Sequence, residues 1–263
     1  MIPLPQTVFL NSIDCFLLIF CRMTGLFVIA PIFGRRNLPV YAKIGFSFLL
    51  ALILTQTINI QDLQYNDNLW MYAVLVAKEF IVGIVIGYVS YMVFTAIMFA
   101  GQIIDTQAGF GIVNVIDPMS NIPVPITANF YFILSMLVFL LVNGHHALIK
   151  ALFDSFKLIP VGEAAFTPNM MNDVLRIMTG TFILGFKIAG PVVGTILVTD
   201  IALGVISKTI PQMNVFVVGM PAKVILGMLT IVITIPVFIS ILDIVINGVN
   251  SEMFNIVQSM VVR

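Results

Sequence analysis

Seven ionisable residues lie inside or at the ends of long apolar segments: Asp14, Arg22, Lys78, Glu79, Lys187, Asp200 and Asp243. Charges in such surroundings are costly, so each marks either a functional site or a charge pair. They could couple the movement of an ion, pair between helices or subunits, or reach the membrane surface from a helix end. We favour pairing, and Asp14 and Asp243 fit the helix-end alternative best. Lys78 and Glu79 are adjacent, so they point in different directions and need separate partners.

The chain contains two histidines, His145 and His146, which are neighbours. A metal centre needs several converging ligands, such as two His one helical turn apart together with a carboxylate. Side chains of neighbouring residues on a helix diverge by about 100°, so these two are poorly placed to bind one ion. The sequence also lacks the GxSxG, Walker and HExxH motifs. We therefore predict no metal, no cofactor and no enzymatic activity.

The composition shows which elements must carry these residues. Of 263 residues, 60% are hydrophobic and 9% are charged, whereas soluble domains carry roughly 25% charged residues. The mean hydropathy is +1.12. Twelve Lys and Arg balance twelve Asp and Glu, so nothing suggests nucleic acid as a partner. These values exclude a soluble enzyme, a disordered chain and a disulfide-rich secreted domain, and they predict an integral membrane protein.

Apolar runs of the right length for membrane helices occur along the whole chain. A hydrocarbon core of ~30 Å needs about 20 apolar residues in a helix, and lipid leaves backbone groups no other partners. The predicted fold class is therefore an all-α membrane protein, with one domain over 1–263. Six candidate helices cover residues 8–33, 44–60, 71–100, 126–149, 174–206 and 221–247. An amphipathic tail helix over 251–262 should dock on the protein itself.

Two further patterns concern helix packing and orientation. Gly83 and Gly87, and likewise Gly190 and Gly194, are four residues apart, which favours close helix packing. Pro191 could alternatively kink its helix. Lys and Arg are spread almost evenly over alternate connections, so the positive-inside rule gives no orientation. Either some segments do not span the membrane, or the chain is part of an assembly.

Glycine and proline residues gather in the stretch GQIIDTQAGFGIVNVIDPMSNIPVP, residues 101–125. Glycine permits positive φ and proline stops helices, so 109–125 should be irregular. The stretch is nevertheless apolar, and irregular backbone at membrane depth must be buried in protein or line a cavity. It is either a packed connecting loop or a constriction in a conduit. The plug candidates are Gly109, Phe110, Gly111, Ile112, Val113, Val115, Ile116, Asp117, Pro118 and Met119.

Two more stretches complete a recognisable order of motifs: LLVNGHHALIKALFDSFKLIP at 140–160 and DIALGVISKTIPQMNVFVVGMPAKVILG at 200–227. Together with 101–125, they resemble the FliR family, subunits of the flagellar type III export gate, over nearly the whole chain. Besides Gly109, Asp117 and Pro118, the residues that carry the resemblance are Gly101, Asp105, Gln107, Asn143, Gly144, His145, Asp200, Pro211, Gln212, Asn214, Phe216, Gly219 and Pro221.

The resemblance implies a role that composition could not reveal. FliR-like proteins form a gate with FliP and FliQ, with FlhB alongside and FlhA nearby, in the inner membrane of bacteria at the flagellar basal body. Unfolded flagellar proteins pass through this gate, and its subunits are broken helical hairpins that rise above the bilayer. The family's pore plug follows the third long helix, which corresponds to 109–125 here. The role is non-enzymatic and uses no cofactor.

Other functions remain open at this point. A virulence type III secretion system contains a related gate subunit, although the Asp117-Pro118 and Asn143-Gly144-His145 elements resemble the flagellar branch more. A stand-alone secondary transporter would place substrate at broken helices and would show internal repeats, but the two halves of this chain do not correspond. Within the family reading, we expect the stretch 211–221, between Lys208 and Lys223, to form a re-entrant turn against another subunit.

Overall fold

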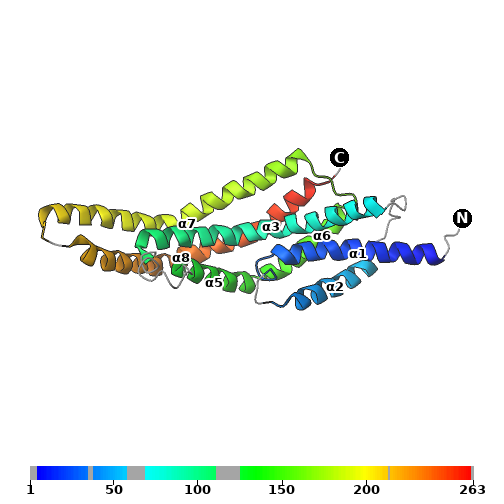
Figure 1. The fold of residues 1–263 in the computed structure, drawn as a ribbon, viewed down its shortest axis with the longest axis horizontal. Helices are drawn as coiled ribbons and strands as arrows, with labels where there is room; N and C mark the ends of the chain where they lie inside the picture. Colours follow the sequence, from blue (N-terminus) through cyan, green and yellow to red (C-terminus); the bar gives the residue numbers. More distant parts are fainter. Residues whose placement is uncertain (1–4, 35–37, 58–68, 111–124, 213, 262–263) are drawn as a thin grey trace. The chain divides into compact units, whose positions relative to one another are not determined.

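The structure, a computed structural model, describes residues 5–34, 38–57, 69–110, 125–212 and 214–261. These residues form helices and no strands, which confirms the all-α fold (Figure 1). The helices are α1 (Pro5–Ile29), α2 (Val40–Thr57), α3 (Leu69–Ala108), α5 (Ile126–Leu141), α6 (Gly144–Leu158), α7 (Pro168–Thr209) and α8 (Val215–Gln258). By length and composition, α2, α3, α7 and α8 can each cross a membrane, and α5 with α6 can form a fifth, broken span.

The predicted single helix over 126–149 is wrong. The chain forms α5 and α6, which are bent by 65° relative to each other. The break falls at Asn143, whose φ of 56° is left-handed. Asn tolerates this conformation better than most residues, which is why the helix can stop here inside an apolar run. The second piece, α6, is amphipathic and buries Leu148, Leu152 and Phe156.

The predicted ends of the last segment are also wrong. Helix α8 begins at Val215 rather than at 221, and it continues through Pro221 and Pro236 to Gln258. The residues of the predicted tail helix are thus the end of α8 and not a separate element. They do dock on the protein, as expected, because Met253, Val257 and Met260 are buried. Phe254, predicted for the same buried face, is exposed.

The described residues divide into two compact units. The first comprises Met1–Met92, Asn143–Ile177 and Asn247–Arg263. In it, α1 and α2 form a hairpin (Figure 1), joined by edge-to-face contacts such as Phe16 with Phe48 and Phe27 with Phe46. The core of this unit is apolar and takes side chains from α1, α3, α6 and the end of α8: Leu18, Met23, Leu26, Val82, Ile86, Leu148, Leu152, Ile256 and Met260.

The second unit comprises Val93–Val142 and Met178–Ile246. Its core combines α3, α5, α7 and α8, with Ile97, Tyr131, Val192 and Phe238 buried. Tyr131 stacks on Phe238 with ring centroids 4.4 Å apart. The single-domain organisation expected from the sequence stays a prediction.

Candidate functional site

The most buried charges of the chain form one ion pair in the first unit. Arg22 of α1 donates from Nε to Glu79 Oε2 (2.5 Å) and from Nη2 to Glu79 Oε1 (3.0 Å), and both side chains are completely buried. This two-pronged geometry suits a guanidinium and a carboxylate. The residues are 57 positions apart. The expectation that ionisable residues pair between helices is therefore confirmed for these two.

The remaining capacity of the pair is used by the segment that leads out of α6. Arg22 Nη1 donates to Ser155 Oγ and to the carbonyl oxygen of Ile159, both at 3.2 Å. The guanidinium also lies over the Phe156 ring, 4.1 Å from its centroid. Glu79 Oε1 accepts from the N–H of Gly162 at 2.8 Å. A buried charge pair needs such additional hydrogen bonds to offset the loss of water.

Glycines bring α1 and α3 close enough for this pairing. A Cβ at Gly83 would lie 2.0 Å from the carbonyl oxygen of Arg22, and one at Gly25 would lie 2.3 Å from that of Phe80. No larger residue fits at such a contact. The predicted close helix packing at Gly83 and Gly87 is thereby confirmed. By contrast, a Cβ at Gly190 or Gly194 would meet no atom of the described chain within 4 Å.

Asp105, a motif residue, holds the start of α5 from the end of α3. Its carboxylate accepts from the N–H of Thr127 (2.9 Å) and the N–H of Ala128 (3.3 Å), and it is buried. Helix α5 lacks a side-chain cap of its own, because Pro125 occupies the N-cap. The carboxylate therefore satisfies two free donors and lies at the positive end of the helix. At the same crossing, a Cβ on Gly101 would lie 2.2 Å from Ala128 Cα.

Asn143, Gly144 and His145 form the bend between α5 and α6. Gly144 is buried at the first position of α6, and Asn143 is its N-cap without a side-chain hydrogen bond. The His145 and His146 rings lie against each other, with centroids 4.1 Å apart, rather than diverging. Among the described residues, no group of three His, Cys, Asp or Glu could hold a metal ion. The conformational role of Asn143 is thus the clearest function within this motif.

The third motif lies at the α7–α8 connection of the second unit. Asp200 forms an ion pair with Lys223, and both side chains are partly exposed. The predicted re-entrant turn over 211–221 is too long: Pro211 and Gln212 form an exposed turn, and the helix resumes at Val215. Asn214 is the residue before α8, and its side-chain oxygen accepts from Val217 N–H at 3.4 Å. Gly219 and Pro221 lie within the helix. The side chain of Phe216 lies outside the description.

The expected plug is largely outside the described residues, which hold only its first two members. Helix α3 ends at Ala108, and Gly109 then takes a positive φ of 84°. Phe110 is half-buried, and Gln107 is exposed on the last turn of α3. The other plug candidates, from Gly111 to Met119, lie within 111–124. Their role stays a prediction.

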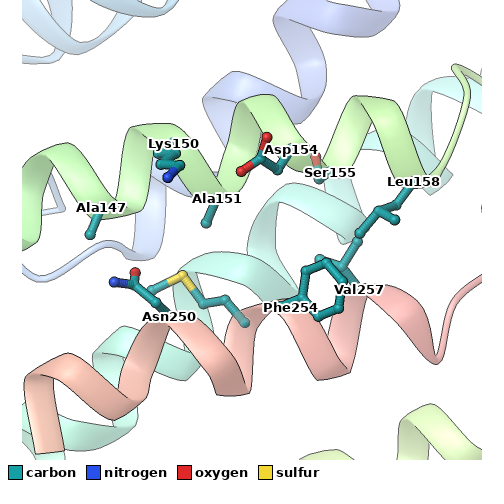
Figure 2. A pocket seen from close by; sticks show the side chains of 10 residues that line it. Ala147, Lys150, Ala151, Asp154, Ser155, Leu158, Asn250, Phe254 and Val257 are labelled. Atoms are coloured by element: carbon teal, nitrogen blue, oxygen red, sulfur yellow. The ribbon is translucent and has the colours of Figure 1, made fainter.

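A groove in the first unit runs between α6 and the end of α8 (Figure 2). Its volume is about 190 Å³, and its small residues Ala147 and Ala151 lie opposite Met253, Phe254 and Val257. Lys150 and Asp154 lie at its edge, but Asp154 already pairs with Lys157 at 2.8 Å. The groove contains no nucleophile or converging ligand set. It belongs to the contact between α6 and α8.

Comparison with known proteins identifies the family. Residues 13–249 match the family of bacterial export proteins, family 1. The flagellar biosynthetic protein FliR of Bacillus subtilis is 37% identical over 238 residues, which cover 87% of this chain and 90% of the relative. The chain belongs to the bacterial export proteins, family 1. FliR of Escherichia coli is 26% identical over 91% of the chain and 90% of the relative, and FliR of Aquifex aeolicus is 29% identical over 84% of each.

Membership of the export family and of its FliR branch confirms the resemblance found from three ordered motifs. The motifs did not reveal the buried Arg22–Glu79 network, although both charges stood out in apolar surroundings. Ser155, Ile159 and Gly162 carry no signal of their own, because two of the three contribute backbone groups. The two units thus show separate features: a locked ion pair in the first, and a capped helix start with a long helical pair in the second.

Proposed function

We propose that this chain is a non-enzymatic subunit of the flagellar type III protein export gate in the bacterial inner membrane. In this role it assembles with FliP- and FliQ-like subunits, with FlhB- and FlhA-like components nearby. Unfolded flagellar proteins pass through the resulting channel. The observation that carries the proposal is the similarity to FliR proteins over about nine-tenths of both chains. It also favours the flagellar gate over that of a virulence secretion system.

The length of the last helices supports an assembly that extends beyond the bilayer. Helix α8 contains 44 residues, which corresponds to about 66 Å at 1.5 Å per residue, about twice the ~30 Å hydrocarbon core. Much of its surface is apolar and exposed, including Val217, Ile225, Val232 and Ile233. Apolar surface beyond the hydrocarbon needs a protein cover. Neighbouring subunits would provide it.

The glycines of α7 support the same arrangement. Helices in membrane assemblies approach one another at small residues. Gly190 and Gly194 are exposed, and a Cβ at either would meet open space within the described chain. They lie on the α7 that also carries Asp200, whose partner Lys223 comes from α8. A partner helix could therefore pack closely on α7 without disturbing the contacts already present.

Co-expression tests the proposal. With FliP- and FliQ-like subunits from the same source, the chain should purify as one stable complex, whereas alone it should aggregate. Gly194→Leu should remove it from the complex, because a large side chain would occupy the space of a partner helix. The matched control is Gly45→Leu on α2, where the added side chain also meets open space but should be tolerated. Recovery of a monodisperse, long-lived solitary protein would count against the proposal.

We further propose that Gly109 to Met119 contribute a constriction in this channel. Apolar side chains can hold back water and ions by dewetting, without any charge. Deletion of 111–121 should leave an assembled complex that leaks ions and still exports protein in part. A loop that only packs between helices would instead be needed for assembly, so its deletion should abolish the complex without a leak. An intact complex with unchanged ion permeability would refute the constriction.

A further inference from the structure

Helix α2 presents apolar side chains in nearly every direction. Its buried residues, Ser47, Ala51 and Leu54, follow a spacing of four and three and so form one narrow face. Most of the remaining large side chains are exposed: Val40, Tyr41, Ile44, Phe46, Phe48, Leu49, Leu52 and Ile53. The helix contains one charged residue, Lys43, in its first turn. A helix without a polar face is not adapted to water.

The dimensions of α2 match the hydrocarbon layer. Its 18 residues correspond to about 27 Å, close to the ~30 Å of a bilayer core. Polar side chains mark both ends, with Lys43 at the first turn and Thr55, Gln56 and Thr57 at the last. Between them, the exposed surface carries no charge. Helices α3, α7 and α8 each have 40 residues or more and lack this match.

Aromatic side chains mark the two ends of this surface. Tyr41, at the start of α2, is 87% exposed, and Trp70, at the start of α3, is 81% exposed. Tyr72 Oη donates to the carbonyl oxygen of Asp14 at 3.3 Å, which places the start of α3 beside the N-terminal half of α1. Since α1 and α2 form a hairpin (Figure 1), Tyr41 and Trp70 mark opposite ends of α2. Tyr and Trp are enriched at both membrane–water interfaces.

The size of the exposed side chains distinguishes lipid from protein as the neighbour. Protein contacts between membrane helices favour small residues, and on α2 the small Ser47 and Ala51 are buried on the narrow packed face. The exposed face carries large residues such as Leu49 and Ile53. We propose that this face of α2, bounded by Tyr41 and Trp70, contacts the acyl chains of the membrane rather than another protein. The proposal depends on membrane embedding and is independent of the export role.

Nitroxide accessibility tests this surface in the full-length chain. Cys15 and Cys21 are both free, so Cys15→Ala and Cys21→Ala remove the native thiols without breaking a disulfide. Leu49→Cys and Ile53→Cys then carry a spin label on the exposed face, and Ser47→Cys serves as the buried control on the same helix. The co-expressed complex is reconstituted into phosphatidylcholine–phosphatidylglycerol vesicles. Collision rates are measured with oxygen, which concentrates in lipid, and with a water-soluble nickel chelate.

We expect oxygen to reach the labels at 49 and 53 several-fold more often than the label at 47, with the nickel chelate nearly excluded. Labels at Tyr41→Cys and Thr57→Cys should show the reverse trend, because these positions approach the interfaces. Two results would overturn the proposal. Low collision rates with both reagents at 49 and 53 would indicate a protein cover, and a high rate with the nickel chelate would indicate water. Assembly of the complex is read separately by co-purification, so failure of the export-gate proposal is distinguishable.

Discussion

Loss of either member of the Arg22–Glu79 pair should strongly destabilise the first unit. Arg22→Met leaves the buried Glu79 carboxylate with the Gly162 N–H as its remaining printed donor, and Glu79→Gln leaves a buried guanidinium without a counter-charge. Removing one partner of a buried ion pair typically costs about 3–5 kcal/mol in the free energy of unfolding. We expect each single variant to lie in this range, since both side chains are fully buried.

The double variant Arg22→Met/Glu79→Gln separates the charge effect from simple loss of packing. It carries no uncompensated charge, and the Gln side chain can still accept from Gly162. Its cost should therefore fall below the sum of the two single costs by about 2 kcal/mol or more, within the range seen for contacting residues. The measurement is a double-mutant cycle from equilibrium unfolding of the purified complex in mixed detergent micelles.

A surface pair provides the matched control. Lys157 and Asp154 are 2.8 Å apart, and the Lys157 side chain is 78% exposed. Lys157→Met should change the unfolding free energy by less than about 1 kcal/mol, because exposed ion pairs contribute little. If Arg22→Met costs no more than this control, or if the two single costs simply add, then the pair is not a coupled structural element and the reasoning fails.

Three other predictions concern single contacts. Asp105→Ala should cost about 1–3 kcal/mol in thermal or chemical unfolding because two buried N–H groups of α5 lose their acceptor, whereas Asp105→Asn, which keeps one acceptor, should cost less; equal costs would contradict the capping role. Asn143→Val should destabilise by about 1–2 kcal/mol, since a β-branched residue resists φ of 56°, and Asn143→Gly should be nearly neutral; the comparison is made by thermal midpoint. Truncation before Ser259 removes the carbonyl groups that accept from Thr167 Oγ1 and Ala165 N–H, together with buried Met260, and should lower the cellular level of the protein, whereas truncation after Met260 should not.

The sequence predicted the helices well where length alone decides. An apolar run of about 20 residues must satisfy its backbone internally, and α2, α3, α7 and α8 follow from that requirement. The break within 126–149 was missed because the run is continuously apolar. The dipeptide Asn143-Gly144, a common turn signal, could have located it. The onset of α8 at Val215 was missed because Pro221 was taken as a helix stop, yet here it lies within the first turns of the helix.

Predictions for the site divide along the same line. The pairing of buried charges follows from the cost of a lone charge, but the choice of Glu79 for Arg22 depends on a helix crossing between residues 57 positions apart. The role of Asp105 was likewise hidden, because Pro125 gave no hint that α5 would take its cap from another helix. Motif order identified the family without assigning a contact to any of these residues.

The glycine crossing and the ion pair are better understood as one element than as two. Because a Cβ at residue 83 would lie 2.0 Å from the Arg22 carbonyl oxygen, any larger residue there must push α1 away from α3. The Arg22 and Glu79 side chains extend from the same two helices, so that displacement would lengthen hydrogen bonds of 2.5 and 3.0 Å and admit water to the charges. Conversely, the pair fixes the register at which the glycines meet. A buried salt bridge contributes little net stability by itself, but it can select one packing arrangement over others. For a chain whose apolar helices could slide past one another at small energetic cost, we regard this selection of register as the main role of the pair.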